Sequence, residues 1–356
     1  MNEFLSNLER DDEDSKDNSV AKIGLRPTSL SEFAGQEKTK KILNLILSAS
    51  RKRMQPPPHL LFEGPAGFGK TTLAMIVAGE MMLPMYTIHS PNIEKIEEVQ
   101  GIFAEIANKG EHCVVFVDEV HRLKKKLQEG LYPIMEDYKV LWAEVELDLP
   151  KFTLVAATTE FGSLSAPMRD RFGQIFSLTE YKLSDMEMII QRASGVLGMH
   201  ITNGKNNGHS NSKCPPRLRC DIRHTGTTTN NAVQYIAERS RMTPRNAIRL
   251  LERSRDVTDM YGDRVCTQEL AEQTMEILSI DELGLTEQDR QYMSALLSVH
   301  GGGAGLEAIA LSTNIDETTI VDVIEPHLMR IGMIERNPKG RDLTTKAIQH
   351  LGVKIS

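Results

Sequence analysis

Three glycines, a lysine and two threonines follow an apolar run near residue 60, and their spacing suits the binding of phosphate groups. The run HLLFE leads into GPAGFGKT at residues 64–71, which fits the pattern G-x-x-x-x-G-K-[ST]. Glycines let the backbone turn its N–H groups toward phosphate oxygens, and the start of the next helix adds positive partial charge. The sequence therefore predicts that ATP binds through Gly64, Pro65, Gly67, Gly69, Lys70, Thr71 and Thr72.

Two residues of this loop and two carboxylates farther along the chain would complete a site for hydrolysis. Lys70 is expected to neutralise the β- and γ-phosphates, and Thr71 is expected to ligate Mg²⁺. The apolar run VVFV ends in Asp118 and Glu119, and the carboxyl ends of parallel strands form the ligand-binding edge of a sheet. We expect Asp118 to hold Mg²⁺ through water and Glu119 to orient and polarise the attacking water.

Polar residues farther downstream could also touch the nucleotide. Thr159 ends the run FTLVAATT and could hydrogen-bond the γ-phosphate or the lytic water. Arg169 and Arg171, in APMRDRFG, fall on a predicted short surface helix. From there an arginine could stabilise transition-state charge at the γ-phosphate of a neighbouring subunit, and a surface salt bridge is the alternative. Arg245, in MTPRNA, begins a helix of the second domain and could sense nucleotide.

The elements that must position these residues alternate between short strands and longer helices over residues 60–180. This rhythm predicts an α/β domain whose parallel sheet is covered by helices on both faces. Past Tyr181 helices take over, and short helices closed by a Pro-Gly hairpin near the C-terminus indicate a winged helix. The predicted divisions are an acidic disordered tail at 1–20, the α/β domain at 21–181, a helical domain at 182–280 with an inserted loop at 203–229, and the winged helix at 281–356.

Composition and charge exclude several classes of protein. The chain has 356 residues, 40% of them hydrophobic, and no apolar run reaches the roughly 18 residues of a membrane helix. The N-terminal segment carries seven acidic and two basic side chains without an apolar core, so it is not a secretory signal. Four scattered cysteines fit a reducing, cytoplasmic compartment. The net charge of -7 argues against indiscriminate nucleic-acid binding but permits a local basic patch.

Taken in order, these motifs resemble those of the RuvB family, the AAA+ motors that drive branch migration of Holliday junctions. The similar stretches cover nearly all of residues 24–353 and include LRPTSLSEFAGQEK, GPAGFGKTTLA, FVDEVHRL, LYPIMEDY, APMRDRFG, TPRNAIRLLERSRD, DELGL and IEPHLMRIGMIERNPKGRDLTTKAIQHLG. The resemblance implies an AAA+ P-loop core, an all-α lid and a C-terminal winged helix. It also implies an ATP-hydrolysing DNA motor of recombination and repair. A clamp-loader-type switch and a DNA-binding scaffold with a decayed ATPase are the alternatives.

The resemblance assigns roles around the nucleotide that the residues alone leave open. It makes Thr159 the first sensor, Arg171 the finger acting in trans, and Arg245 the second sensor. It places adenine near Arg26, Pro27 and Tyr181. Because a finger in trans needs a neighbouring subunit, a homo-hexameric ring follows from it.

The resemblance also implies partners for that ring. They are double-stranded DNA, four-way junctions and a RuvA-like junction-binding protein. The predicted grip on DNA phosphates comes from Arg336, Lys339 and Arg341 of the wing. Residues 283–356 carry seven basic and nine acidic side chains, so the contact should be sparse and sensitive to salt.

The chain departs from the family pattern at two places near these sites. Between MEDY and LDLP only KVLWAEVE remains, where the family carries a longer hairpin that docks on RuvA, so docking is expected to be altered. Trp142 in this hairpin is either a core residue, which burial statistics favour, or a hydrophobic anchor. Glu160 stands where the family commonly has arginine after the two sensor threonines, which reverses a charge near the active site.

Histidines and cysteines outside these motifs raise the question of a metal site. His209, Cys214, Cys220 and His224 lie in the inserted loop, but their spacing matches no standard zinc finger. The loop has five basic residues and one acidic residue, which favours a flexible loop that tracks DNA. His121, after the acidic pair, is expected to be structural.

Overall fold

The computed structural model describes residues 24–203, 231–261, 265–298, 303–338 and 340–352. The predicted acidic tail, nearly all of the inserted loop with its four zinc candidates, and Lys339 lie outside the described residues. The chain divides into two compact units. Unit 1 runs to Gly198 and includes Thr243–Ile248, and unit 2 comprises Met199–Met242 and the residues from Arg249 onward. The domain boundaries that the sequence suggests stay predictions.

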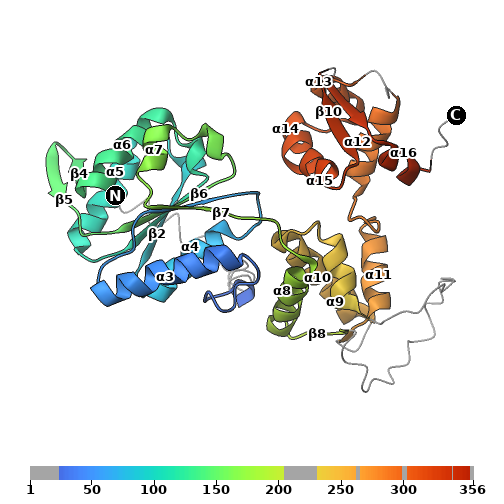
Figure 1. Ribbon diagram of the computed structural model, residues 1–356, viewed down its shortest axis with the longest axis horizontal. Helices are drawn as coiled ribbons and strands as arrows, with labels where there is room; N and C mark the ends of the chain where they lie inside the picture. Colours follow the sequence, from blue (N-terminus) through green and yellow to red (C-terminus); the bar gives the residue numbers. More distant parts are fainter. Residues whose placement is uncertain (1–23, 204–230, 262–264, 299–302, 339, 353–356) are drawn as a thin grey trace. The chain divides into compact units, whose positions relative to one another are not determined.

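Unit 1 is built on a five-stranded sheet of order β2-β3-β6-β1-β7 in which every pairing is parallel, as predicted (Figure 1). The central strands are continuous β-branched and apolar runs, because both faces of the sheet are covered. The strands are β1 (Leu60–Glu63), β2 (Met85–His89), β3 (Val114–Asp118), β6 (Thr153–Thr158) and β7 (Gln174–Ser177).

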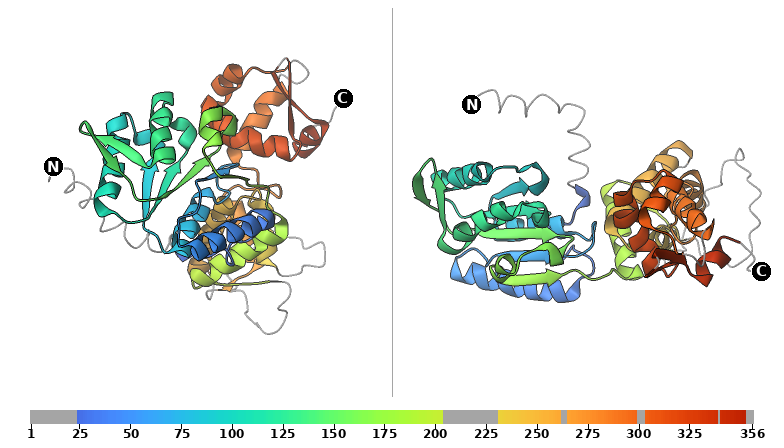
Figure 2. Two further views of the ribbon diagram at one scale, coloured as in Figure 1. Left: turned by 60° about the vertical axis from the view of Figure 1, so that its left-hand side comes forward. Right: turned by 90° about the horizontal axis from the view of Figure 1, so that it is seen from above.

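Helices cover both faces of the sheet, and α3 and α4 lie on one side while α5 and α6 lie on the other (Figures 1 and 2). Alternate strand residues such as Leu61, Val115 and Leu154 pack in one core with Phe103 of α5 and Leu131 of α6. Among the described residues, the α-helices that lie wholly within unit 1 are α3 (Glu37–Arg53), α4 (Lys70–Met81), α5 (Ile96–Lys109), α6 (Lys125–Asp137), α7 (Ala166–Asp170) and α8 (Leu183–Val196).

A separate two-stranded hairpin follows α6. It pairs β4 (Lys139–Trp142) with β5 (Val145–Asp148) through Ala143 and Glu144, whose φ angles are 49° and 65°. Two consecutive positive φ values give the tight turn that suits the twist of paired strands. The core position favoured for Trp142 is wrong, because the hairpin lies outside the main sheet and leaves this side chain 40% exposed.

Unit 2 begins with a group of helices, called the lid helices below, and a pair of two-residue strands. A single helix, α10, begins in unit 1 and continues into unit 2. These elements are β8 (His200–Ile201), α9 (Ala232–Arg239), α10 (Pro244–Tyr261), β9 (Val265–Cys266) and α11 (Gln268–Ile277).

The C-terminal part of unit 2 is a winged helix, as predicted, with its own core around Tyr292, Leu296, Ile309 and Leu328. Gly340 lets the wing approach the backbone of Ala304, since a Cβ added at Gly340 would lie 2.2 Å from the Ala304 oxygen. The elements are α12 (Glu287–Ser298), α13 (Leu306–Thr313), α14 (Glu317–Thr319), α15 (Glu325–Arg330), β10 (Ile334–Asn337), β11 (Gly340–Leu343) and α16 (Thr345–His350). Among the described residues, no helix is both long and apolar enough to cross a bilayer.

Candidate active site

The predicted phosphate loop connects β1 to α4, and its backbone takes conformations that need glycine. Gly69 is the N-cap of α4 with φ 93°, and Gly67 has φ 80°. A Cβ added at Gly69 would lie 2.9 Å from Phe33 Cζ, so the loop is also packed too closely for a side chain. Thr71 and Thr72 follow in the first turn of α4. The N–H groups of this turn have no partner within the helix, which leaves them for an anionic ligand.

The Lys70 ammonium lies inside the loop. Its Nζ donates hydrogen bonds to the carbonyl oxygens of Gly64, at 2.7 Å, and Pro65, at 3.1 Å. Burial lowers the pKa of Lys70, and the charges of Glu119 and Asp118 act in the opposite direction. A buried cation enclosed by a glycine-rich loop at a helix N-terminus fits the phosphates of ATP. The residues present therefore fit the cofactor that the sequence predicts.

The two carboxylates and the sensor threonine meet at the carboxyl edge of the sheet. Strand β6 lies between β1 and β3, so their ends bring Asp118, Glu119 and Thr159 beside the phosphate loop. Glu119 takes a left-handed conformation with φ 48°, which turns its side chain out of the strand direction. Its Oε2 accepts hydrogen bonds from Thr159 Oγ1 at 3.0 Å and from Thr159 N at 3.3 Å. Thr159 thus contacts the carboxylate expected to activate water.

His121 and Glu160 extend this cluster. The buried His121 ring lies with Nδ1 2.9 Å from Thr158 Oγ1 and 3.3 Å from Glu119 Oε2. Its Nε2 lies 3.6 Å from Glu160 Oε1. The residue that departs from the family pattern therefore lies on the far side of an imidazole that touches Glu119, which supports a positioning role for His121.

Three residues are predicted to lie near adenine, and Arg245 is predicted to be the second sensor. Of these four residues, Tyr181 and Arg245 lie beside the phosphate loop. The Tyr181 hydroxyl donates to Phe68 O at 2.9 Å, and burial raises the pKa of this phenol. Arg245 lies beside the loop, because a Cβ added at Gly67 would stand 3.1 Å from Arg245 Cβ. Arg26 is exposed and donates to Met75 Sδ on α4 at 3.3 Å, and Pro27 follows it, half-buried.

Arg171, the predicted finger, is held by α6 and α7. Its Nη1 donates to Pro167 O at 2.6 Å, and its Nη2 lies 3.1 Å from Glu136 Oε2. The guanidinium carbon stands 3.9 Å from the centre of the Tyr132 ring. These contacts fix the guanidinium at the end of α7.

In the wing, Arg336 and Arg341 lie directly opposite each other on β10 and β11. Both also bind a carboxylate that the sequence analysis did not single out. Arg341 Nε lies 2.7 Å from Glu325 Oε1, and Arg336 Nη2 pairs with Glu325 Oε2. Glu325 is fully buried and also accepts from the Tyr292 hydroxyl at 2.8 Å. The Arg336 side chain remains 48% exposed, whereas that of Arg341 is 17% exposed.

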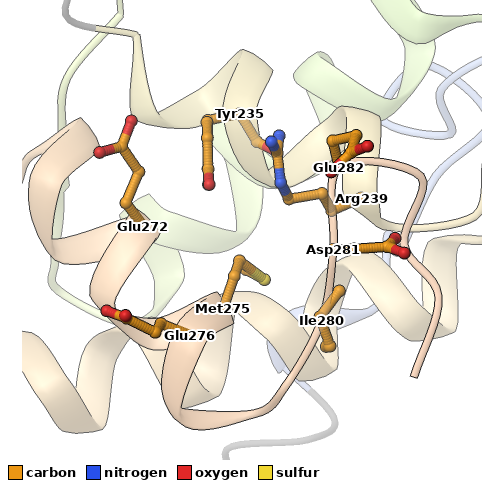
Figure 3. Close-up of a pocket in the computed structure, with 8 residues that line it drawn as sticks. All are labelled: Tyr235, Arg239, Glu272, Met275, Glu276, Ile280, Asp281 and Glu282. Atoms are coloured by element: carbon orange, nitrogen blue, oxygen red, sulfur yellow. The ribbon is translucent and has the colours of Figure 1, made fainter. Parts of the chain in front are cut away.

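A shallow hollow in unit 2 is distinct from the site above (Figure 3). The Arg239 guanidinium carbon lies 3.5 Å from the centre of the Tyr235 ring within it. Its walls carry four carboxylates, those of Glu272, Glu276, Asp281 and Glu282. Such a rim repels a polyphosphate, so this hollow does not suit ATP. Within the described ranges no three or more His, Cys, Asp or Glu side chains are grouped so that they could hold one metal ion.

Two contributors to the site went unrecognised in the sequence. Ser90 Oγ donates to the Asp118 carbonyl at 2.6 Å and fixes the end of β3. Gln36 accepts from Thr179 N at 3.0 Å and ties the segment before α3 to the end of β7. Only the stretch FAGQEK, shared with the family, drew attention to Gln36, and nothing marked Ser90.

Comparisons with known proteins find matches over most of the chain. Residues 25–178 match the family model for the P-loop domain of the Holliday junction DNA helicase RuvB, residues 222–281 match the RuvB AAA lid domain, and residues 282–352 match the RuvB C-terminal winged helix domain. The chain is similar to the Holliday junction branch migration complex subunit RuvB of Campylobacter concisus, with 38% identity over 94% of this chain and 93% of that protein. It is 40% identical to the protein of that name from Methanoregula boonei, over 94% of this chain and 93% of that one.

A solved structure of the RuvB Holliday junction branch migration motor of Thermotoga maritima is also similar. It has a TM-score of 0.76 and 37% identity, and the match covers 93% of this chain and 99% of that one. The similarity extends across the P-loop domain, the lid and the winged helix, in the order that the sequence motifs predict. The chain belongs to the RuvB family.

Proposed function

We propose that this protein is an ATP-driven DNA motor that moves Holliday junctions in recombination and repair. The observation that carries the proposal is the convergence of Lys70, Asp118, Glu119 and Thr159 at one sheet edge, in a chain that matches the RuvB family across three domains. The relatives are named as subunits of a branch migration complex, which supports a role on DNA junctions.

The chemistry proposed for the site is the hydrolysis of ATP to ADP and phosphate. Lys70 neutralises phosphate charge from inside the loop. Thr71 and, through water, Asp118 would hold Mg²⁺, which would supply further charge neutralisation. Glu119 orients and polarises the attacking water, and Thr159, which donates to its carboxylate, fixes the orientation of that carboxylate. Adenine binds near Arg26, Pro27 and Tyr181.

The proposed assembly is a homo-hexameric ring. Arg171 lies at the end of α7 and is held there by Glu136 and Tyr132, so it acts on the nucleotide of the next subunit. Arg245 reads the nucleotide of its own subunit from beside Gly67. Every active site would then contain residues of two protomers, and isolated protomers would hydrolyse ATP poorly.

The proposed DNA contact is the wing. Arg336 keeps nearly half of its side chain exposed while Glu325 fixes its direction, and Arg341 lies opposite it on the same hairpin. Lys339 is proposed as a further contact to DNA phosphates. A RuvA-like protein is the proposed partner for the β4–β5 hairpin, whose exposed apolar residues are Leu141, Trp142 and Val145. Because the turn between these strands is only two residues long, docking should differ from that of a longer hairpin.

The test measures ATP turnover and branch migration of a synthetic four-way junction by the purified chain, with and without a RuvA protein. Lys70→Ala and Glu119→Gln should abolish both activities, whereas Lys52→Ala, at an exposed position on α3, should change neither. Junction-stimulated hydrolysis that persists in both site variants would refute the proposed chemistry. Junction binding by the unaltered chain without any ATP turnover would instead favour a scaffold with a decayed ATPase.

A further inference from the structure

Within unit 2 the lid helices and the winged helix are joined by a buried polar cluster, the Arg241 junction, formed by Arg241, Leu283, Gly284, Asp289, His327 and Arg330. Arg241 Nε donates to Gly284 O at 2.9 Å, and its Nη2 pairs with Asp289 Oδ2. The Arg241 side chain is 13% exposed and that of Asp289 is 1% exposed. A charged pair so far from solvent is only weakly screened by salt.

The main-chain oxygen of Arg241 also accepts a hydrogen bond from the winged helix. Arg330 Nη2 lies 2.7 Å from Arg241 O and 2.9 Å from His327 Nδ1. His327 Nε2 lies 3.1 Å from Leu283 O. A neutral imidazole protonated at Nε2 satisfies both of its contacts. Burial, followed by the charge of Arg241, lowers the pKa of His327 to about 4, so the ring is neutral near pH 7.

Asp289 and Gly284 make the junction stiff on the side of the winged helix. Asp289 Oδ2 also accepts from Thr286 N and Oγ1, both at 2.6 Å, so the carboxylate that binds Arg241 also caps α12. A Cβ added at Gly284 would lie 2.6 Å from Arg239 O. The segment before α12 therefore packs directly on the lid backbone, and a rotation there would break several bonds at once.

The turn that carries Arg241 also carries the residue beside the phosphate loop. Arg241 and Met242 both have positive φ, 56° and 48°, a conformation that non-glycine residues keep only when surrounding contacts enforce it. Thr243, Pro244 and Arg245 follow at once. The first segment of unit 2 ends at Met242, and the segment Thr243–Ile248 belongs to unit 1. One short turn thus has the Arg241 junction at one end and Arg245, near Gly67, at the other.

We propose that Arg241 is the positioning residue that couples the nucleotide cycle to the winged helix. Its guanidinium binds both Asp289 and Gly284, so a displacement of the turn that carries Arg245 is transmitted to α12 and α15. This inference rests on the proposed motor function. A motor does work on DNA only if the element that senses nucleotide and the element that holds DNA move together. Such coupling requires a continuous chain of contacts between the two elements. The hydrogen bonds and the ion pair of the Arg241 junction supply these contacts on the side of the winged helix.

The experiment measures junction-stimulated ATP turnover and branch migration by the full chain and takes their ratio, the base pairs moved per ATP. Arg241→Ala should keep ATP turnover within about threefold of the unaltered chain while the ratio falls at least tenfold. Asp289→Asn should lower the ratio in the same direction. Arg249→Ala, at an exposed position of α10, and Glu287→Gln, at an exposed position of α12, match these changes in charge and should leave the ratio unchanged.

Other outcomes overturn the inference. An unchanged ratio in Arg241→Ala, or equal losses of turnover and migration with normal hydrogen exchange in β10 and β11, would show that Arg241 does not couple the two. If Arg241→Ala does not fold, Arg241→Lys decides, since it keeps the charge but not the fork, and a normal ratio in it would refute the idea. Failure of the unaltered chain to move a junction would refute the proposed function instead.

Discussion

Replacing Glu325 with glutamine should loosen the wing. The Glu325 carboxylate is fully buried and holds Arg336, Arg341 and the Tyr292 hydroxyl. Like charges directly opposite each other on paired strands destabilise a hairpin, and Arg336 and Arg341 are such a pair. Without the carboxylate, the two guanidinium groups would repel each other across β10 and β11.

The magnitude follows from burial. Breaking a buried ion pair costs about 3–5 kcal/mol. Since the glutamine carbonyl oxygen can still accept hydrogen bonds and the Arg336 side chain is 48% exposed, we expect the lower end, about 3 kcal/mol. That corresponds to a fall of about 100-fold in the protection of wing amides from hydrogen exchange. The matched control is Asp322→Asn, an equal change of charge at an exposed position near the same helix.

The assay is hydrogen exchange of the full-length protein, followed at the amides of β10 and β11. Exchange in Glu325→Gln that stays within about threefold of the unaltered chain would refute the reasoning. It would mean that the desolvation cost of burying Glu325 cancels the stabilisation from its three partners.

The same carboxylate predicts a dependence on pH. Burial would raise the pKa of Glu325, but the hydrogen bonds from Arg341, Arg336 and Tyr292 outweigh it and lower the pKa below its ordinary value of 4.5. Its contribution to stability is therefore complete above that value and is lost as the pH falls through the lower folded pKa. Wing amides should lose protection on acidification below about pH 4.5, and Glu325→Gln should show less of this loss.

Three further changes test other parts of the structure. Glu119→Gln should reduce the rate of ATP turnover by about 10²–10⁴-fold while the Kd for ATP stays within about threefold, as measured by nucleotide titration. Tyr181→Phe loses the hydrogen bond to Phe68 O and should lower the free energy of unfolding by about 1 kcal/mol. An unchanged free energy of unfolding would show that this hydrogen bond does not contribute to stability. Gly340→Ala places a Cβ against the Ala304 oxygen and should destabilise the wing by about 1–3 kcal/mol, visible as faster exchange in β11.

The phosphate loop could be predicted from the sequence because its function depends on local backbone. The glycines, the lysine and the threonines are contiguous, and the apolar run before them specifies β1. The parallel sheet also followed from local patterns, since doubly covered strands read as unbroken apolar runs. Convergence of Asp118, Glu119 and Thr159 then required only that β3 and β6 end at the same edge. Their roles in catalysis stay predictions.

Exposure of a residue is harder to predict, because it depends on what the fold puts next to it. Tryptophan is usually largely buried, yet Trp142 lies on a hairpin that the main sheet does not include. The ring rests on α5, where a Cβ added at Gly101 would lie 3.3 Å from Trp142 Cη2. The sequence of the hairpin carries no sign of this neighbour, which is about forty residues away.

The hardest feature to predict from the sequence was which acidic side chain forms an ion pair with which arginine. A basic wing in the sequence suggests DNA contact, but it does not show that Glu325, 11 and 16 residues away, already binds both arginines. The same holds for Arg171 and Glu136, which are 35 residues apart. In each case a carboxylate of the chain holds the guanidinium that a phosphate is expected to bind. Binding of phosphate must therefore compete with or share that carboxylate's hydrogen bonds. Because a guanidinium has five N–H donors, sharing is possible, and the carboxylate then fixes the direction from which the phosphate approaches.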